Sequence, residues 1–265
     1  MDSKPQISNS KRLFGLIGFP LSHSFSQKYF TEKFKKENIA DCEFKVFPLE
    51  NIESLPALLK ENPTLGGLSV TIPHKQSVMK YLDDIDSAAQ KIGAVNCIKI
   101  EALHPSPVLG EGPGVRSTGY NTDIVGFENS LKPLLKSHHT HALILGTGGA
   151  AKAVAYILDK TKIKFRLVSR NKNTFSYSQI TEAIVHESTL MINTTPLGMF
   201  PNLNSCPDIP YQFLSSKHLL YDLTYNPEES LFLKKGKEKG AQIKNGLEML
   251  HQQAEKAWEI WNHPT

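Results

Sequence analysis

Short apolar runs alternate along the chain with longer segments in which apolar residues recur every three or four positions. An apolar run bounded by glycine, proline or polar residues is typical of a buried strand, and the longer period is typical of a helix with one buried face. The runs that predict strands are 12–18, 43–48, 65–73, 93–101, 142–145, 165–170, 190–198 and 218–225. The segments that predict helices are 27–36, 51–60, 76–82, 86–91, 124–135, 152–158, 231–238 and 246–261. Strands that alternate with helices in this way predict an α/β fold.

One long stretch, residues 102–119, breaks this alternation. It contains three prolines and four glycines and shows neither period. We therefore expect an irregular loop or a hairpin arm there. The helix predicted at 124–135 would then lead into a second domain, which the glycines near position 146 open.

Composition narrows the class of protein. With 265 residues, 40% of them hydrophobic and 21% charged, the chain has the composition of a globular protein of one large domain or two of usual size. A net charge of +4 is too small to indicate nucleic acid by itself, and no stripe of basic residues is interleaved with aromatic ones. We expect a small-molecule substrate, which the positive charge suits if that molecule is an anion, and no nucleic-acid partner.

Cysteine usage and the polar N-terminus bear on location. Cys42, Cys97 and Cys206 are far apart and form no C-x-x-C pair, which argues against a disulfide framework and for a reducing compartment. Residues 1–11 lack the apolar segment of a secretory signal, and no apolar run approaches the ~20 residues of a membrane span. No G-x-S-x-G hydrolase motif and no metal-binding H-E-x-x-H motif is present. We expect a cytoplasmic protein without a membrane partner or a metal.

The most informative stretch joins the strand predicted at 142–145 to the helix predicted at 152–158. Between them Gly146, Gly148 and Ala151 follow the spacing G-x-G-x-x-A. The first glycine permits a tight turn, the second lets a pyrophosphate approach the backbone, and the alanine lets the helix pack close to the strand. The helix N-terminus adds unpaired N–H groups and a partial positive charge. The arrangement predicts a Rossmann-type dinucleotide-binding domain.

The end of the next predicted strand, residues 168–172 (VSRNK), indicates which dinucleotide binds. An acidic residue at this place binds the ribose hydroxyls of NAD, but the stretch contains none. Arg170 and Lys172 offer positive charges instead, and an arginine can pair with a 2′-phosphate and stack on adenine. We therefore predict NADP(H) as the cofactor.

Two stretches of the first third place polar groups where a ligand could bind. Ser24 and Ser26 precede the helix predicted at 27–36, where two hydroxyls would form a small site for a carboxylate. Capping that helix is an equally good interpretation. His74 and Lys75 follow a predicted strand, and α/β sheets bind ligands at strand ends. Most lysines are simply solvated, so this position alone does not make Lys75 catalytic.

Eight stretches together resemble the shikimate dehydrogenase family in their order and spacing from residue 12 to the C-terminus. They are 22–26 (SHSFS), 70–75 (VTIPHK), 93–96 (GAVN), 120–123 (YNTD), 146–150 (GTGGA), 169–171 (SRN), 193–199 (NTTPLGM) and 245–253 (NGLEMLHQQ). The resemblance implies the reversible reduction of 3-dehydroshikimate to shikimate by NADPH, in the route through chorismate to the aromatic amino acids. The chain departs from the family at Ser69, where asparagine is common, and at Ser169 and Asn171, where asparagine and threonine are usual.

The resemblance also implies roles for individual residues. Lys75 matches the family's catalytic lysine, and Asp123 matches its aspartate partner. The residues implied to bind the substrate are Ser24, Ser26, Thr71, Asn96, Tyr225 and Gln253. The residues implied to contact the cofactor are Gly146, Thr147, Gly148, Gly149, Ala150, Ser169, Arg170, Asn171, Thr195 and Gly246.

Two α/β domains, with the active site in the cleft between them, are implied as well. We expect residues 1–123 together with 242–265 to form the substrate-binding and catalytic domain, and residues 124–241 to form the NADP-binding Rossmann domain. Because Gln253 lies on the last predicted helix, that helix should fold back onto the first domain. We expect a monomer or a homodimer.

Two other functions remain open. A quinate/shikimate dehydrogenase would use NAD as well as NADP, although Arg170 without a neighbouring acid favours the NADP-specific form. A non-catalytic NADPH-binding sensor would bind the cofactor without turning over a substrate, although Lys75 and Asp123 argue against it. Those two residues suit reduction of a ketone, because charge that builds on the ketone oxygen needs a proton donor.

Overall fold

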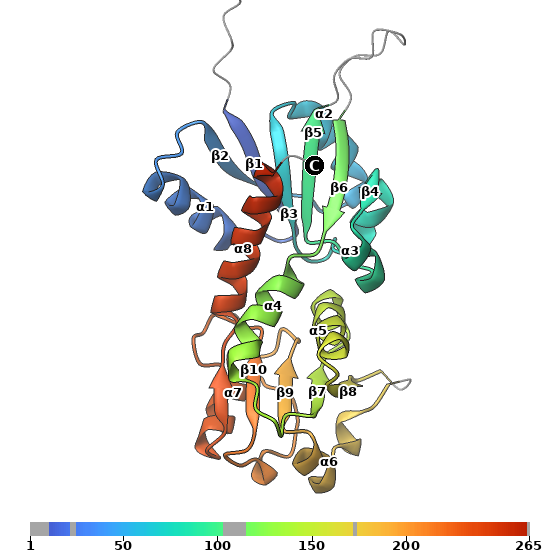
Figure 1. Ribbon diagram of the computed structural model, residues 1–265, viewed down its shortest axis with the longest axis vertical. Helices are drawn as coiled ribbons and strands as arrows, with labels where there is room; N and C mark the ends of the chain where they lie inside the picture. The colour runs from blue at the N-terminus through green and yellow to red at the C-terminus, as the bar shows by residue number, and fades with distance from the viewer. Residues whose placement is uncertain (1–10, 22–24, 103–114, 172–173, 264–265) are drawn as a thin grey trace, which may run out of the picture. The chain divides into compact units, whose positions relative to one another are not determined.

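A computed structural model describes residues 11–21, 25–102, 115–171 and 174–263 (Figure 1). The chain divides into two compact units. Residues 1–121 and 257–265 form the first unit, and residues 122–256 form the second. Each unit is built on a sheet of its own, so the α/β class is confirmed.

The first unit is built on a six-stranded mixed sheet with the order β2-β1-β3-β5-β6-β4. The strands are β1 (Arg12–Gly18), β2 (Cys42–Pro48), β3 (Leu65–Val70), β4 (Asp84–Ile85), β5 (Cys97–Ala102) and β6 (Val115–Tyr120). The helical segments are α1 (Phe25–Lys36), η1 (Ile52–Ser54), α2 (Leu55–Glu61), η2 (Ser77–Tyr81) and α3 (Ser87–Ile92). Strand β1 is parallel to both β2 and β3, whereas β5 is antiparallel to β3 and β6. The carboxyl ends of β1 and β3 and the start of β5 therefore lie at one edge of this sheet.

Local sequence sets where several of these segments begin and end. The Asn51 side chain accepts a hydrogen bond from Glu53 N at 3.0 Å and caps η1. Asp86 caps α3 by accepting from Ala88 N at 2.9 Å, and Gly93 ends that helix at a φ of 68°, which glycine adopts without strain.

An aromatic core joins the end of α8 (Leu247–Asn262) to the first sheet. Trp261 is 3% exposed and stacks on Phe14 with ring centroids 5.0 Å apart, and its indole nitrogen donates to Ile98 O at 3.0 Å. Phe30 lies 5.3 Å from the same indole. A Cβ at Gly67 would lie 2.3 Å from this indole, so the close approach of the helix to β3 requires a glycine there. The last turns of α8 therefore belong to the core of the first unit.

The second unit is built on a five-stranded parallel sheet with the order β11-β10-β9-β7-β8. Its strands are β7 (His141–Leu145), β8 (Lys164–Val168), β9 (Leu190–Asn193), β10 (Leu219–Asp222) and β11 (Gln242–Lys244). Its helical segments are α4 (Asp123–Leu131), η3 (Lys132–Leu134), α5 (Gly149–Lys160), η4 (Tyr177–Gln179), α6 (Glu182–Glu187), η5 (Tyr211–Phe213), α7 (Leu231–Glu238) and the first part of α8. Because β7 lies between β8 and β9, the strand order reverses there, and ligands bind at the carboxyl ends of strands at such a point.

Most predicted elements are confirmed, and the differences have local causes. For residues 102–119 the sequence predicts an irregular loop or a hairpin arm. Residues 115–120 form β6, which pairs antiparallel with β5, so the hairpin arm is the correct alternative in that part, while 103–114 lie outside the described residues. The helix predicted at 76–82 is a short 3₁₀ helix, and the one predicted at 51–60 is divided into η1 and α2. The short elements β4, α6 and β11 were not predicted.

The boundary between the units also differs from the expected one. Strand β11 is the edge of the second sheet, because it pairs with β10 in parallel. Residues 242–256 therefore lie in the second unit, although the sequence suggested that 242–265 belong with the first domain. Only the last turns of α8, from Ala257 onwards, join the first unit. Among the described residues, no helix has both the length and the apolar character needed to cross a bilayer.

Candidate functional site

In the first unit, three of the predicted site residues lie at one edge of the sheet. Thr71 follows β3, and its backbone N–H donates to Ile17 O of β1 at 3.0 Å. Asn96 precedes β5, and its carbonyl accepts from Val70 N of β3 at 2.8 Å. The backbone thus fixes Thr71 and Asn96 beside each other at the carboxyl ends of β1 and β3.

Lys75 is held at the same edge. Its carbonyl oxygen accepts a hydrogen bond from Val95 N at 2.7 Å, which ties the turn after β3 to the segment that enters β5. The Lys75 side chain is half-buried. The neighbouring His74 is 3% exposed, and its Nε2 is hydrogen-bonded to Leu49 O, which indicates a structural role. Of the two polar residues that follow β3, the lysine is therefore the candidate for chemistry.

The predicted carboxylate site falls at the start of α1. This helix begins at Phe25, two residues earlier than predicted, so Ser26 lies inside its first turn. That turn itself contains no acidic residue that would offset the partial positive charge of the helix N-terminus. Ser24 and His23 lie outside the described residues.

In the second unit, the glycine loop has the geometry that the motif predicts. Gly146 adopts a φ of +119°, and a Cβ there would lie 2.5 Å from Thr194 Oγ1, so only glycine fits this turn. At Gly148, apart from the glycine itself and its two chain neighbours, no atom of the described residues lies within 4 Å of the place a Cβ would take. Ala151 lies on the buried face of α5, is 1% exposed and belongs to the hydrophobic core of the second unit. The N-terminus of α5, with Gly149 and Ala150 in its first turn, is thus open to an anion.

The end of β8 lies beside this loop. Gly146 N donates to Val168 O at 2.8 Å, which places Ser169 and Arg170 next to the glycine turn. Ser169 Oγ accepts from Asn171 N at 3.0 Å and holds the tight turn after β8. The Arg170 side chain is exposed, and Lys172 lies outside the described residues.

Thr195, Tyr225 and Gly246 lie at the ends of neighbouring strands or in the loops that follow them. Thr195 follows β9 and is held by the Asn193 side chain, whose Oδ1 accepts from Thr195 N at 3.0 Å. Tyr225 is half-buried, and burial raises the pKa of its hydroxyl. A Cβ at Gly246 would lie 2.1 Å from Leu223 O, so this glycine allows the start of α8 to pack on the loop after β10.

The remaining candidates belong to helices of the second unit. Asp123 opens α4 and is 3% exposed, and Gln253 lies half-buried on α8. Lys75 lies in the first unit, so its pairing with Asp123 stays a prediction.

Two buried polar residues at the ends of β9 and β10 were not predicted as site residues. Asn193 and Asp222 are both 0% exposed, and Asn193 Nδ2 donates to Asp222 Oδ1 at 3.0 Å. Burial raises the pKa of Asp222 to about 6, although hydrogen bonds from Ser230, Thr224 and Asn193 oppose that shift. The only signal in the sequence is a polar residue that closes each of two apolar runs, LMIN and LLYD.

The pKa of Asp222 predicts how stability depends on pH. The folded state binds the proton of the Asp222 carboxyl group more tightly than the unfolded chain does. The free energy of unfolding therefore falls as the pH rises from about 4 through 6 and Asp222 ionises. The total fall is about 3 kcal/mol. Asp222→Asn cannot ionise, so its stability relative to wild type should be more favourable at about pH 8 than at about pH 4. Urea unfolding of both proteins at the two pH values measures this, and an equal difference at both would contradict it.

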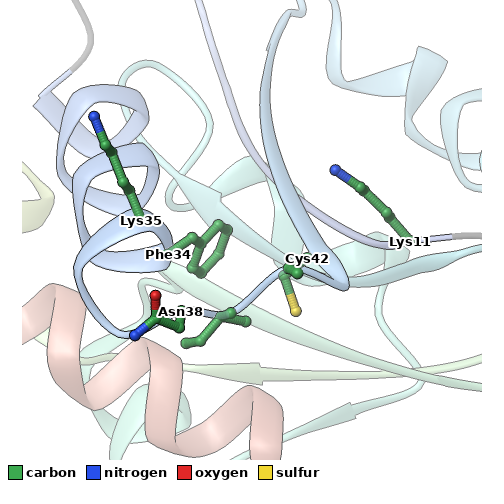
Figure 2. A pocket seen from close by; sticks show the side chains of 7 residues that line it. Lys11, Phe34, Lys35, Asn38 and Cys42 are labelled. Atoms are coloured by element: carbon green, nitrogen blue, oxygen red, sulfur yellow. The ribbon is translucent and has the colours of Figure 1, made fainter.

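A pocket of the first unit lies at the opposite edge of its sheet. Figure 2 shows this pocket of about 350 Å³, between the last turn of α1 and the start of β2. It is lined by Lys11, Phe34, Lys35, Asn38, Ile39, Ala40 and Cys42. Since it lies at the amino ends of the parallel strands, it is not the predicted ligand site. The described residues contain no group of three or more His, Cys, Asp or Glu side chains that could hold a metal ion.

Comparisons with known proteins agree with this architecture. Residues 16–98 match the family described as the shikimate dehydrogenase substrate binding domain. Over 263 residues the chain is 40% identical to shikimate dehydrogenase (NADP(+)) of Clostridium beijerinckii, covering 94% of this chain and 91% of that protein.

The chain is also similar to solved structures that contain bound small molecules. Shikimate 5-dehydrogenase of Thermus thermophilus, in complex with NADP(H) and shikimate, is 27% identical with a TM-score of 0.78, over 94% of this chain and 93% of that one. Shikimate 5-dehydrogenase of Listeria monocytogenes, in complex with shikimate and NAD, is 25% identical with a TM-score of 0.79, over 99% of this chain and 95% of that one.

Proposed function

The chain belongs to the shikimate dehydrogenase family, and we propose that it catalyses the reversible NADPH-dependent reduction of 3-dehydroshikimate to shikimate, in the route through chorismate to the aromatic amino acids. The observation that carries the proposal is the juxtaposition of Lys75, Thr71 and Asn96 at the carboxyl ends of β1 and β3 in the first sheet. The full-length relationship to NADP-dependent members of the family supports it.

The first unit provides the groups that bind the substrate. Thr71 and Asn96 offer a hydroxyl and an amide to the ring hydroxyls. Ser26, together with Ser24, takes the carboxylate near the N-terminus of α1, where an anion is favoured. Tyr225 and Gln253 of the second unit complete the set of residues that contact the substrate.

Lys75 and Asp123 provide the acid–base chemistry. NADPH supplies the hydride when it is bound. As the substrate carbonyl is reduced, negative charge builds on its oxygen, and the Lys75 ammonium stabilises that charge and donates the proton. The Asp123 carboxylate orients the ammonium and accepts a hydrogen bond from a substrate hydroxyl. In the reverse direction, neutral Lys75 accepts the hydroxyl proton.

The second unit binds the cofactor. The open backbone at Gly148 and the first turn of α5 take the pyrophosphate. They fit it because that turn has no acidic residue and, among the described residues, no atom beyond the chain neighbours of Gly148 lies within 4 Å of where its Cβ would be. Arg170 pairs with the 2′-phosphate, with Ser169 and Asn171 on the same turn. Thr147, Gly149, Ala150, Thr195 and Gly246 are the remaining residues that we assign to the cofactor.

Arg170→Ala tests the selection of NADPH over NADH. The Kd of NADPH should rise about 10- to 100-fold, because a charge-assisted hydrogen bond to a phosphate contributes roughly 1.5 to 3 kcal/mol. The Kd of NADH should change little, because NADH has no 2′-phosphate. Arg166→Ala is the matched control, since Arg166 is an exposed arginine on β8, the strand that Arg170 follows. Titration of protein fluorescence with each cofactor gives both constants, and equal losses for both cofactors would refute the assignment.

The substrate alternatives need a separate comparison. A quinate/shikimate dehydrogenase would oxidise quinate with a kcat/KM comparable to that for shikimate and would use NAD as well. We propose that NADP is preferred over NAD, since no acidic residue follows β8 in the described turn. Comparing kcat/KM for shikimate and for quinate with each cofactor decides between the two substrates.

We also propose that the enzyme is cytoplasmic and works as a monomer or a homodimer. None of Cys42, Cys97 and Cys206 forms a disulfide, which fits a reducing compartment.

A further inference from the structure

The ends of β9 and β10 carry a buried polar pair that the proposed reaction does not use. Asn193 and Asp222 are register partners on adjacent parallel strands, and both side chains are completely buried. A buried carboxylate is unfavourable unless it is hydrogen-bonded. The partners of the Asp222 carboxylate therefore show which groups it holds in place.

The carboxylate accepts three hydrogen bonds from three directions. Oδ1 accepts from Asn193 Nδ2 at 3.0 Å and from Thr224 N at 2.9 Å. Oδ2 accepts from Ser230 Oγ, the residue that caps α7. An ionised carboxylate can only accept, so the amide of Asn193 must present its NH₂ group to Asp222. This leaves the amide oxygen facing the loop after β9.

That amide oxygen holds the loop. Asn193 Oδ1 accepts from Thr195 N at 3.0 Å and from Thr195 Oγ1 at 2.6 Å. The preceding Thr194 bonds Leu145 O through both its backbone N–H, at 2.9 Å, and its hydroxyl, at 2.8 Å. Leu145 is followed directly by Gly146, whose turn has room for no side chain beside Thr194. A chain of hydrogen bonds thus runs from Asp222 through Asn193 to the loop that borders the glycine turn.

We propose that Asp222 is a positioning residue for NADPH binding: it fixes the orientation of the Asn193 amide and thereby the place of Thr195 beside the glycine loop. This rests on the proposed binding of NADPH by the second unit. Asp222 touches neither the cofactor nor the substrate in this account and acts only through Asn193.

Asp222→Ala is the direct test. It removes the acceptor, frees the Asn193 amide to rotate, and should raise the Kd of NADPH about tenfold, the effect of one or two misplaced hydrogen bonds. The KM for NADPH should rise in parallel, whereas kcat at saturating NADPH should change much less. Asp222→Asn should restore most of the affinity, because its Oδ1 still accepts from Asn193 and Thr224 while its NH₂ donates to Ser230.

Ser230→Ala is the matched control. It removes a buried hydrogen bond to the same carboxylate but leaves the bond between Asp222 and Asn193 in place. We expect a lower unfolding temperature and an unchanged Kd of NADPH. A purely structural role for Asp222 predicts instead that stability and affinity fall together in both variants.

Asn193→Asp keeps the proposal testable if Asp222→Ala fails to fold, because it retains the side-chain volume. It places a second carboxyl group against Asp222, and one of the two must hold a proton for the pair to stay together. The ratio of variant to wild-type Kd should therefore be larger at about pH 8 than at about pH 6.

NADPH binding is measured without substrate, so these outcomes are separate from the test of the reaction. A wild type that binds NADPH but does not reduce 3-dehydroshikimate would refute the proposed function and leave the positioning role to be judged on the Kd values. Wild-type affinity for NADPH in a folded Asp222→Ala variant would overturn the positioning role. If that variant does not fold, the role is overturned when the ratio of the Kd of Asn193→Asp to the wild-type Kd does not change with pH. Equal losses of NADPH affinity in Asp222→Ala and Asp222→Asn, or in Asp222→Ala and Ser230→Ala, would also overturn the positioning role of Asp222.

Discussion

Replacing Lys75 by alanine should lower kcat by about a hundred- to ten-thousandfold, the contribution of a positioned proton donor. The reason is the negative charge that forms on the substrate oxygen, which we assign to the Lys75 ammonium to stabilise and to neutralise with a proton. The Kd of NADPH should change little, because Lys75 lies in the first unit and the glycine loop lies in the second. Stopped-flow or steady-state assays at saturating substrate measure kcat, and fluorescence titration measures the Kd.

Lys91→Ala is the control for the loss of a positive charge from the first unit. Lys91 is exposed on α3 and belongs to no proposed site, so this variant should retain wild-type kcat. Turnover of Lys75→Ala close to that of Lys91→Ala would remove Lys75 from the mechanism. A large loss of NADPH affinity in Lys75→Ala would also contradict the assignment.

Replacing Trp261 by alanine should lower the free energy of unfolding of the first unit by about 3 to 5 kcal/mol. The indole is 3% exposed, stacks on Phe14 and fills the space above Gly67, so its removal leaves a cavity in the core. It also removes the hydrogen bond to Ile98 O. Because α8 carries Gln253 on its earlier turns, a loosened C-terminal end should raise the KM for shikimate as well.

The two tryptophans of the chain, Trp258 and Trp261, both lie in the first unit, so their fluorescence reports on that unit during urea unfolding. In Trp261→Ala the remaining Trp258 still provides the signal. Trp261→Phe is the matched control: it keeps a ring against Phe14 and should lose only the share that the hydrogen bond contributes, roughly 1 to 3 kcal/mol. An unfolding midpoint of Trp261→Ala equal to that of wild type would show that this indole is not an anchor.

Much of the local geometry of the candidate site could be predicted, because its signals are local. The turn at Gly146 can be recognised from the residues around it alone. The position of Lys75 follows from a strand that ends shortly before Pro73. In both cases a short apolar run followed by a glycine or proline defines a strand end, where parallel sheets bind ligands. The order of the motifs along the chain then indicated the family, and the family implied a role for each residue.

Other features depend on contacts between distant segments, which periodicity does not reveal. Strand β6 (VRSTGY) is polar in sequence and becomes a strand because β5 and β4 pair with it on either side. The pair of Asn193 and Asp222 exists only because β9 and β10 lie in a particular register. Likewise, the amphipathic pattern of α8 predicts a helix but does not show that only its last turns join the first unit.

The most direct test of the account is the oxidation of NADPH by the purified protein when 3-dehydroshikimate is added. We expect the absorbance of NADPH to fall in proportion to the 3-dehydroshikimate supplied, with shikimate as the product, and the reaction to be much slower with NADH or in Lys75→Ala. A protein that binds NADPH tightly yet leaves its absorbance unchanged in the presence of 3-dehydroshikimate would be a cofactor-binding sensor, and the account would be wrong.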